Sequence, residues 1–141
     1  MTMNPLVAAP SPLAASALVA LGGAAGSVLR YHLGRLAAHL AGPANTFPWG
    51  TLGINILGSL AMGALLGWLA RSTTPGQAET LRLLVGVGLL GGFTTFSTFS
   101  AELVTLLHRG QAGLAIGYAA ASLFAGMAAV VIGLVVAQSA A

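Results

Sequence analysis

Four long apolar segments constrain the fold of this 141-residue chain more than any other feature. They run from about Pro12 to Leu36, Pro48 to Ala70, Leu81 to Leu107 and Gly113 to Ala137. A helix that crosses a lipid bilayer needs about 20 mostly apolar residues. Charged residues make up 5% of the chain, against roughly 25% in soluble domains. We therefore predict an all-α, multi-pass membrane protein with four transmembrane helices.

Short polar stretches rich in turn-forming residues separate these segments, as expected of connecting loops. The predicted organisation is a disordered N-terminal tail over residues 1–11, a single four-helix transmembrane domain over residues 12–137 and a C-terminal tail over residues 138–141. Turn residues predict loops over 41–47, 71–79 and 108–111. The first connection, from about His32 to Phe47, looks somewhat long and carries two histidines.

The positive charges give almost no orientation signal. Four spans place Arg71 and Arg82 on one side of the membrane and Arg30, Arg35 and Arg109 on the other. The excess of basic residues that usually orients a membrane protein is nearly absent. The chain either inserts both ways round or takes one orientation for other reasons. The arginines form no basic cluster, so we expect no nucleic-acid partner, and the lack of cysteine excludes disulfides and thiolate metal sites.

Glycines recur at four-residue spacing, which lets transmembrane helices approach closely. We predict tight helix packing at each such pair. The pairs are Gly22 with Gly26, Gly63 with Gly67, Gly88 with Gly92, and Gly113 with Gly117.

The segment Gly91–Ser100 in the third span is unusually rich in glycine, threonine and serine. Adjacent glycines and β-branched threonines weaken a helix at mid-depth, which predicts a break there. A break exposes backbone carbonyls, which a membrane tolerates only where they are buried in protein or bound to something. A small cation is one candidate. A glycine-lined packing notch in an intact helix is the alternative.

Aromatic and hydroxyl side chains follow the predicted break. Phe96 and Phe99 share a helix face, and Ser97 and Ser100 share a neighbouring one. Phenyl rings have a positive edge, so ring edges and hydroxyl donors together suit a narrow passage for a small anion. Core packing is the alternative interpretation of the phenylalanine pair.

Other polar groups within the spans are few, and each needs an explanation. Asn55, near the middle of the second span, is either interhelical glue or a donor to an anion. Glu102 and Arg30 are functional candidates by their depth, with snorkelling or ion pairing as the alternative for Arg30. Tyr118 and Ser122 share one face of the fourth span and are candidates for the same path.

Three motifs in order make the chain resemble the Fluc/CrcB fluoride channels over nearly its whole length. The motifs are Gly22–Tyr31, Gly50–Ser59, and Gly91–Ser100 followed by Glu102. The resemblance implies a fluoride-selective passive channel that exports fluoride across the inner (plasma) membrane and so provides fluoride resistance. It also implies an antiparallel, dual-topology homodimer with two pores, each built from both subunits.

The resemblance also implies roles for individual residues. A structural sodium ion is expected at the dimer axis, where the third helix is broken near mid-membrane, on the backbone carbonyls of Gly91 and Thr94. Arg30 matches the family arginine near the aqueous vestibule. The anion pore is expected to be lined by Asn55, Phe96, Ser97, Thr98, Phe99, Glu102, Tyr118 and Ser122, with Thr98 favoured for direct contact.

The sequence is less consistent with three other classes of protein. The sequence shows no recognisable group of catalytic residues, so we do not expect an enzyme. A small dual-topology multidrug exporter needs a membrane-embedded carboxylate in its first helix, and this chain has none there. A helical scaffold without transport would explain the glycines but not the Thr/Ser/Phe track.

Overall fold

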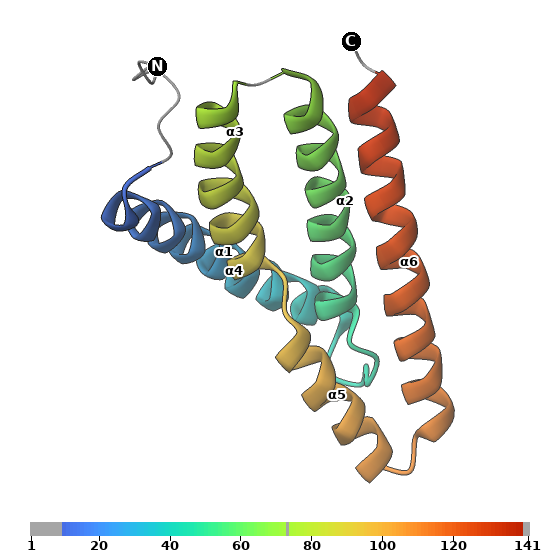
Figure 1. Ribbon diagram of the computed structural model, residues 1–141. Coiled ribbons are helices and arrows are strands. Elements are labelled where there is room, and N and C mark those ends of the chain that lie inside the picture. Colours follow the sequence, from blue (N-terminus) through green and yellow to red (C-terminus); the bar gives the residue numbers. More distant parts are fainter. Residues whose placement is uncertain (1–9, 73, 140–141) are drawn as a thin grey trace, which may run out of the picture.

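A computed structural model describes residues 10–72 and 74–139 (Figure 1), and these residues form helices joined by short turns. Four helical spans are long and apolar enough to cross a membrane by their length and composition. This confirms the predicted all-α class and number of spans. The elements are α1 (Pro12–Ala41), α2 (Trp49–Ser72), α3 (Pro75–Leu81), the π-helix η2 (Arg82–Leu90), α4 (Gly91–Phe93), α5 (Phe96–His108) and α6 (Ala112–Ser139).

The third span is assembled from α3, η2, α4 and α5, which together cover Pro75–His108. Most of the predicted N-terminal tail, and residues 140–141 of the predicted C-terminal tail, lie outside the described residues.

The first helix is longer than predicted. Pro12 occupies its first turn, and the Ser11 hydroxyl accepts a hydrogen bond from the Ala14 amide at 3.3 Å, which is N-terminal capping. The helix ends only at Gly42, whose φ of +79° suits glycine. The predicted long first loop is therefore wrong: His32 and His39 lie on α1, and the connection spans residues 42–48.

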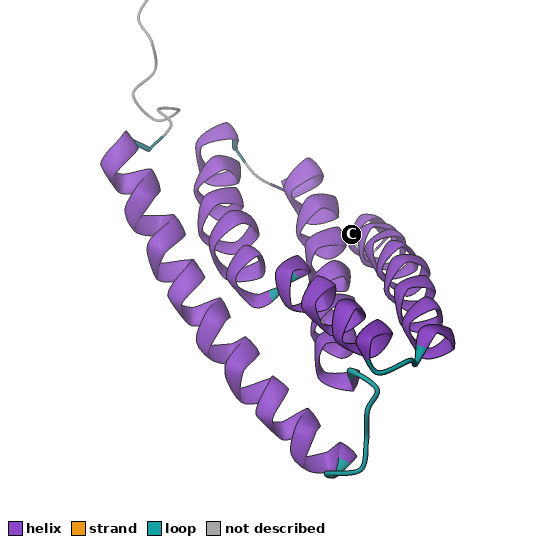
Figure 2. Ribbon diagram, turned by 90° about the horizontal axis from the view of Figure 1, so that it is seen from below, coloured by secondary structure: helices purple, strands orange, loops and turns teal. Residues whose placement is uncertain are grey.

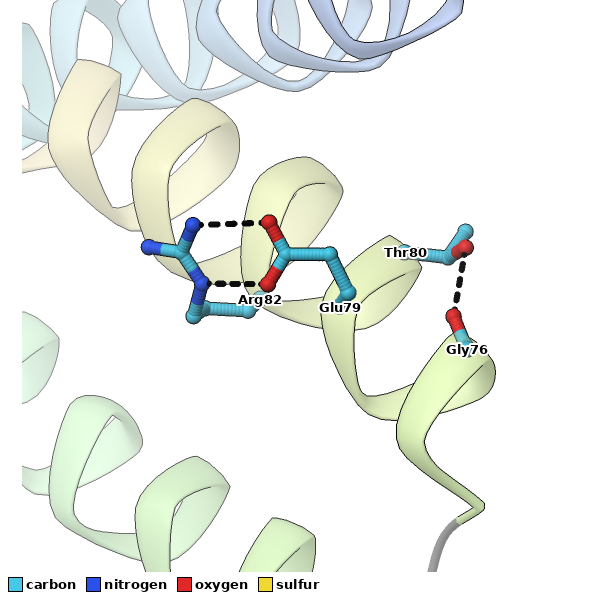
Figure 3. A network of polar contacts seen from close by, with 4 residues as sticks. All are labelled: Gly76, Glu79, Thr80 and Arg82. Carbon is cyan, nitrogen blue, oxygen red and sulfur yellow. Dashed lines mark hydrogen bonds and ion pairs between the residues drawn. The ribbon is translucent and has the colours of Figure 1, made fainter. Parts of the chain in front are cut away.

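The second connection is also shorter than predicted. Pro75, favoured in a first helical turn, begins α3 inside the expected loop over residues 71–79. Near the end of α3, the Arg82 guanidinium faces the Glu79 carboxylate through two parallel contacts of 2.8 Å (Figure 3). Both side chains are partly exposed, so solvent screens the pair and it contributes little to stability. It does cancel one of the five arginine charges.

Glycine contacts determine how closely the helices pack. α2 packs along α6, and α1 packs along η2 and α4 (Figures 1 and 2). A Cβ on Gly63 would clash with the Val130 carbonyl of α6, and one on Gly22 would clash with the Leu84 carbonyl of η2. Three predicted glycine pairs are confirmed as close contacts. The prediction is wrong for Gly113 and Gly117, where a Cβ would meet no atom within 4 Å.

Two glycines of α6 provide a matched test of this packing. Gly133→Ala places a methyl group against the Leu60 carbonyl of α2. The backbone of α2 can shift only at a cost in energy, so we expect a loss of about 3 kcal/mol in the free energy of unfolding. Gly117→Ala has open space and gains helix propensity, so it should be neutral or stabilise by up to about 1 kcal/mol. Thermal unfolding in detergent measures both, and equal effects would contradict this description of the α2–α6 contact.

Candidate functional site

The third span is interrupted at Thr94 and Thr95, which confirms the predicted break. Both residues are extended, with φ/ψ of −81°/159° and −150°/116°, and α5 leaves α4 in a new direction (Figure 1). The interruption follows the glycines and does not occur at them, because Gly91 and Gly92 belong to α4. Gly92 instead permits close approach to Gly23 of α1. The nine-residue π-helix η2 precedes the break, and π-helical turns are frequent near functional sites.

The break redirects two backbone amides. The Thr95 amide donates to Asn55 Oδ1 at 2.9 Å, and the Thr98 amide donates to Thr95 Oγ1 at 3.2 Å. In a continuous α-helix these amides would bind the carbonyls four residues earlier, those of Gly91 and Thr94. The two carbonyls named in the sequence prediction are therefore the ones that lose these helical donors.

Asn55 clamps the extended segment from α2. Besides accepting from the Thr95 amide, its Nδ2 donates to the Thr95 carbonyl at 3.2 Å. The side chain thus satisfies both backbone groups of one residue at the break. This contact supports the interhelical-glue interpretation of Asn55, and one of its two amide donors remains beyond this pair.

The Thr95 hydroxyl organises the start of α5. It caps the helix by accepting from the Thr98 amide, and it lies 3.0 Å from Thr98 Oγ1 and 3.3 Å from Ser97 Oγ. The hydroxyls of Thr95, Ser97 and Thr98 therefore meet at the N-terminus of α5. Thr95 is not among the predicted site residues, although a threonine at the start of a helix is a recognised capping signal.

Glu102 lies between two hydroxyl donors from neighbouring helices. Thr51 of α2 donates to its Oε1 at 2.7 Å, and Tyr118 of α6 donates to its Oε2 at 2.8 Å. Tyr118 is fully buried and Thr51 is buried, whereas Glu102 is half-buried, so the two donors hold the carboxylate from its protein side. Thr51 is not among the predicted site residues either. Its position one helical turn before Asn55 was the available signal.

Three aromatic residues near the break pack against one another, and a fourth, Phe96, is exposed. Phe99 lies 5.1 Å from Tyr118 between ring centroids, and Phe47 lies 5.5 Å from the same tyrosine. Phe96 lies 5.7 Å from Phe99 at an interplanar angle of 42°, which confirms that the pair shares a face. Phe96 is nevertheless 79% exposed, so little of this chain covers it.

Two cavities of about 710 and 700 Å³ lie against the break. The first, which we call the vestibule, is lined by Arg30, Thr95, Thr98 and Glu102 among others. The second, which we call the phenylalanine groove, is lined by Gly91, Thr94, Thr95, Asn55, Phe96, Phe99 and Ser122 among others. Thr95 lines both. Of the predicted pore residues, Ser97 and Tyr118 line neither: Ser97 is exposed and Tyr118 is buried in the core.

Within residues 10–72 and 74–139, no three His, Cys, Asp or Glu side chains gather to hold a metal ion. Any cation near the break would therefore rely on carbonyl and hydroxyl oxygens, which suit hard cations. The carbonyls of Gly91 and Thr94 are chemically appropriate, because their helical donors are redirected and both residues line the phenylalanine groove.

Tyr118→Phe removes one donor to Glu102 and leaves a partly unsatisfied carboxylate. We expect the free energy of unfolding to fall by about 1–3 kcal/mol. Tyr31→Phe is the matched control, because its hydroxyl accepts from Arg35 at an exposed position, and it should change stability by under about 0.5 kcal/mol. Both are measured by thermal unfolding in detergent. Similar effects of the two changes would show that the buried contact does not stabilise the fold.

Comparison with known proteins gives a consistent result. A sequence model described as "CrcB-like protein, Camphor Resistance (CrcB)" matches residues 17–134. A Novosphingobium aromaticivorans protein named fluoride-specific ion channel FluC is 57% identical over 122 residues, covering 86% of this chain and 94% of that protein. Proteins of the same name from Erythrobacter litoralis and Rhizobium etli are each 50% identical, over 125 and 119 residues. They cover 87% and 84% of this chain, and 91% and 92% of their own lengths.

Proposed function

The chain belongs to the CrcB family, and we propose that it is a passive, fluoride-selective channel that lets fluoride leave the cell across the inner membrane. A member of this family is a channel and not an enzyme. The observation that carries the proposal is the broken third span, where Thr95 lines both the vestibule and the phenylalanine groove. One residue thus joins a charged mouth to an aromatic groove at mid-span.

The proposed path runs from the vestibule past the start of α5 into the phenylalanine groove. Fluoride is small and strongly hydrated, so a selective path must replace its water with donors without holding it too tightly. Thr98 of the vestibule and the free donor of Asn55 supply hydrogen bonds along this path, and Ser97 lies exposed beside Phe96. The edges of Phe96 and Phe99 supply weak positive potential. Arg30 attracts the anion within the vestibule.

Glu102 of α5 and Ser122 of α6 complete the proposed lining, and Tyr118 of α6 supports it from the core. The carboxylate of Glu102 is engaged by Thr51 and Tyr118, which draws its negative charge toward two donors. In this proposal the tyrosine acts chiefly by holding Glu102, because it lines neither cavity. Ser122 reaches the phenylalanine groove directly.

We propose that the working unit is an antiparallel homodimer with two pores. A phenyl ring that is 79% exposed beside exposed Ser97 and Thr98 makes only one wall of a passage. A second copy would supply the other wall. The weak asymmetry of the arginines between the two sides supports insertion in both orientations.

A structural sodium ion fits the break in this arrangement, held by the carbonyls of Gly91 and Thr94. When bound, it would neutralise the carbonyl dipoles that the break exposes and hold the two copies together at their axis. The Thr95 and Thr98 amides donate to Asn55 Oδ1 and Thr95 Oγ1. The Gly91 and Thr94 carbonyls therefore lack these two helical donors.

Electrogenic efflux from liposomes tests the proposed function against an exporter. A passive channel releases fluoride only when a potassium ionophore balances the charge, and it needs no proton gradient. A proton-coupled exporter would make fluoride release depend on a pH gradient, and a scaffold would release nothing with or without that gradient.

A further inference from the structure

One face of α1 forms a wall of the vestibule. Ser27, Arg30, Tyr31, Gly34 and Arg35 all line that cavity, at the spacing of a single helix face. Arg35 lies five residues beyond Arg30, about 7.5 Å further along the axis toward the helix end. Arg30 is half-buried and Arg35 is exposed, so two cations are placed at successive depths of one cavity.

Neither arginine has an acidic side chain available to neutralise it. The chain contains two acidic residues. Glu79 pairs with Arg82 at the far end of the third span. Glu102, the other charged residue of the vestibule, is held by Thr51 and Tyr118. The charged side chains of the vestibule are therefore two arginines and one glutamate.

Tyr31 holds the outer arginine in place. Arg35 Nη1 donates to the Tyr31 hydroxyl at 3.2 Å, and its Cζ lies 5.8 Å from the centroid of the tyrosine ring. A guanidinium near an aromatic ring is attracted to the face of that ring. Because an unrestrained arginine side chain samples many rotamers, this contact favours the position at the mouth of the cavity.

We propose that Arg35, positioned by Tyr31, is a second cationic site that gathers fluoride at the outer vestibule before the anion reaches Arg30. The proposal rests on the proposed channel function. A cleft with an excess of one sign of charge, such as the two arginines and one glutamate of the vestibule, raises the local concentration of the opposite ion, and salt weakens this effect. At 1 M ionic strength the screening length falls to about 3 Å, against about 30 Å at 0.01 M.

Fluoride efflux at several ionic strengths tests the proposal. At about 10 mM ionic strength, Arg35→Gln should lower the rate about two- to fivefold, and at about 1 M the two proteins should agree within about 1.5-fold. Arg35→Lys should keep most of the low-salt rate, because it retains the charge. Tyr31→Phe should give an intermediate loss at low salt. Arg109→Gln is the matched control, because Arg109 is exposed but lines neither cavity.

Each outcome decides between explanations. A loss for Arg35→Gln that is equal at all salt concentrations, or that Arg109→Gln reproduces, would overturn the proposal. So would a loss that disappears in liposomes without anionic lipid, because Arg35 would then act as a headgroup anchor. If the unaltered protein releases no fluoride at all, the channel function itself fails. If it conducts and Arg35→Gln matches it at low salt, this inference alone fails.

Discussion

Phe96→Ile is expected to reduce fluoride efflux from liposomes at least tenfold while the protein remains folded. Isoleucine keeps an apolar side chain but has no ring edge to stabilise a dehydrated anion. A barrier increase of only about 1.4 kcal/mol slows passage tenfold. Folding of the chain should be little affected, because the ring is 79% exposed and packs mainly on Phe99.

Phe124→Ile is the matched control for the ring. Phe124 lies on α6, is 68% exposed and lines neither cavity, so its replacement should leave efflux unchanged. Gel filtration and thermal unfolding in detergent establish that both variants are folded. Normal efflux through Phe96→Ile, or an equal loss in both variants, would remove the ring from the conduction path.

Changes at Asn55 are expected to have the second large effect, and two substitutions separate its two roles. Asn55→Ala leaves the Thr95 amide and carbonyl without their partner. An unsatisfied buried group costs about 1–3 kcal/mol, so this variant should lose both thermal stability and conduction. Asn55→Asp keeps the acceptor for the Thr95 amide but places a negative charge beside the path. It should retain more stability than the alanine variant and still fail to conduct fluoride.

Leu57→Ala on the same helix serves as the control, because Leu57 is 53% exposed and lines neither cavity. It should conduct normally. If Asn55→Asp conducts at the normal rate, Asn55 is a structural clamp that lies outside the anion path. If Asn55→Ala unfolds at the same temperature as the unaltered protein, the clamp on Thr95 does not stabilise the break.

Local composition was sufficient to predict the class of fold. Long apolar segments predict spanning helices, because in lipid a single segment can satisfy its backbone N–H and C=O groups only by forming a helix. The break was predicted from weak helix formers, yet its position at Thr94 and Thr95 was not. That position depends on Asn55, which supplies replacement hydrogen bonds from a different helix. A partner 40 residues away along the chain leaves no signal in the local pattern.

Local composition also failed to predict where two helices end or begin. Alanine and leucine continue α1 to Gly42, and Pro75 begins α3 inside a stretch rich in turn residues. Composition alone predicted loops in both places. Among the site residues, Thr51 and Thr95 escaped notice because a threonine in an apolar helix is common. Their importance comes from Glu102 and Asn55, which tertiary packing brings within hydrogen-bond distance.

Selective ion efflux from liposomes tests the central claim most directly. Purified protein is reconstituted with equal internal fluoride and chloride, a potassium ionophore is added, and each anion is followed with its own electrode. The account predicts rapid loss of fluoride with retention of chloride, because the larger ion fits poorly among the hydroxyl donors and ring edges near Thr98. Equal release of both anions, or none from folded and correctly inserted protein, would contradict a fluoride-selective channel.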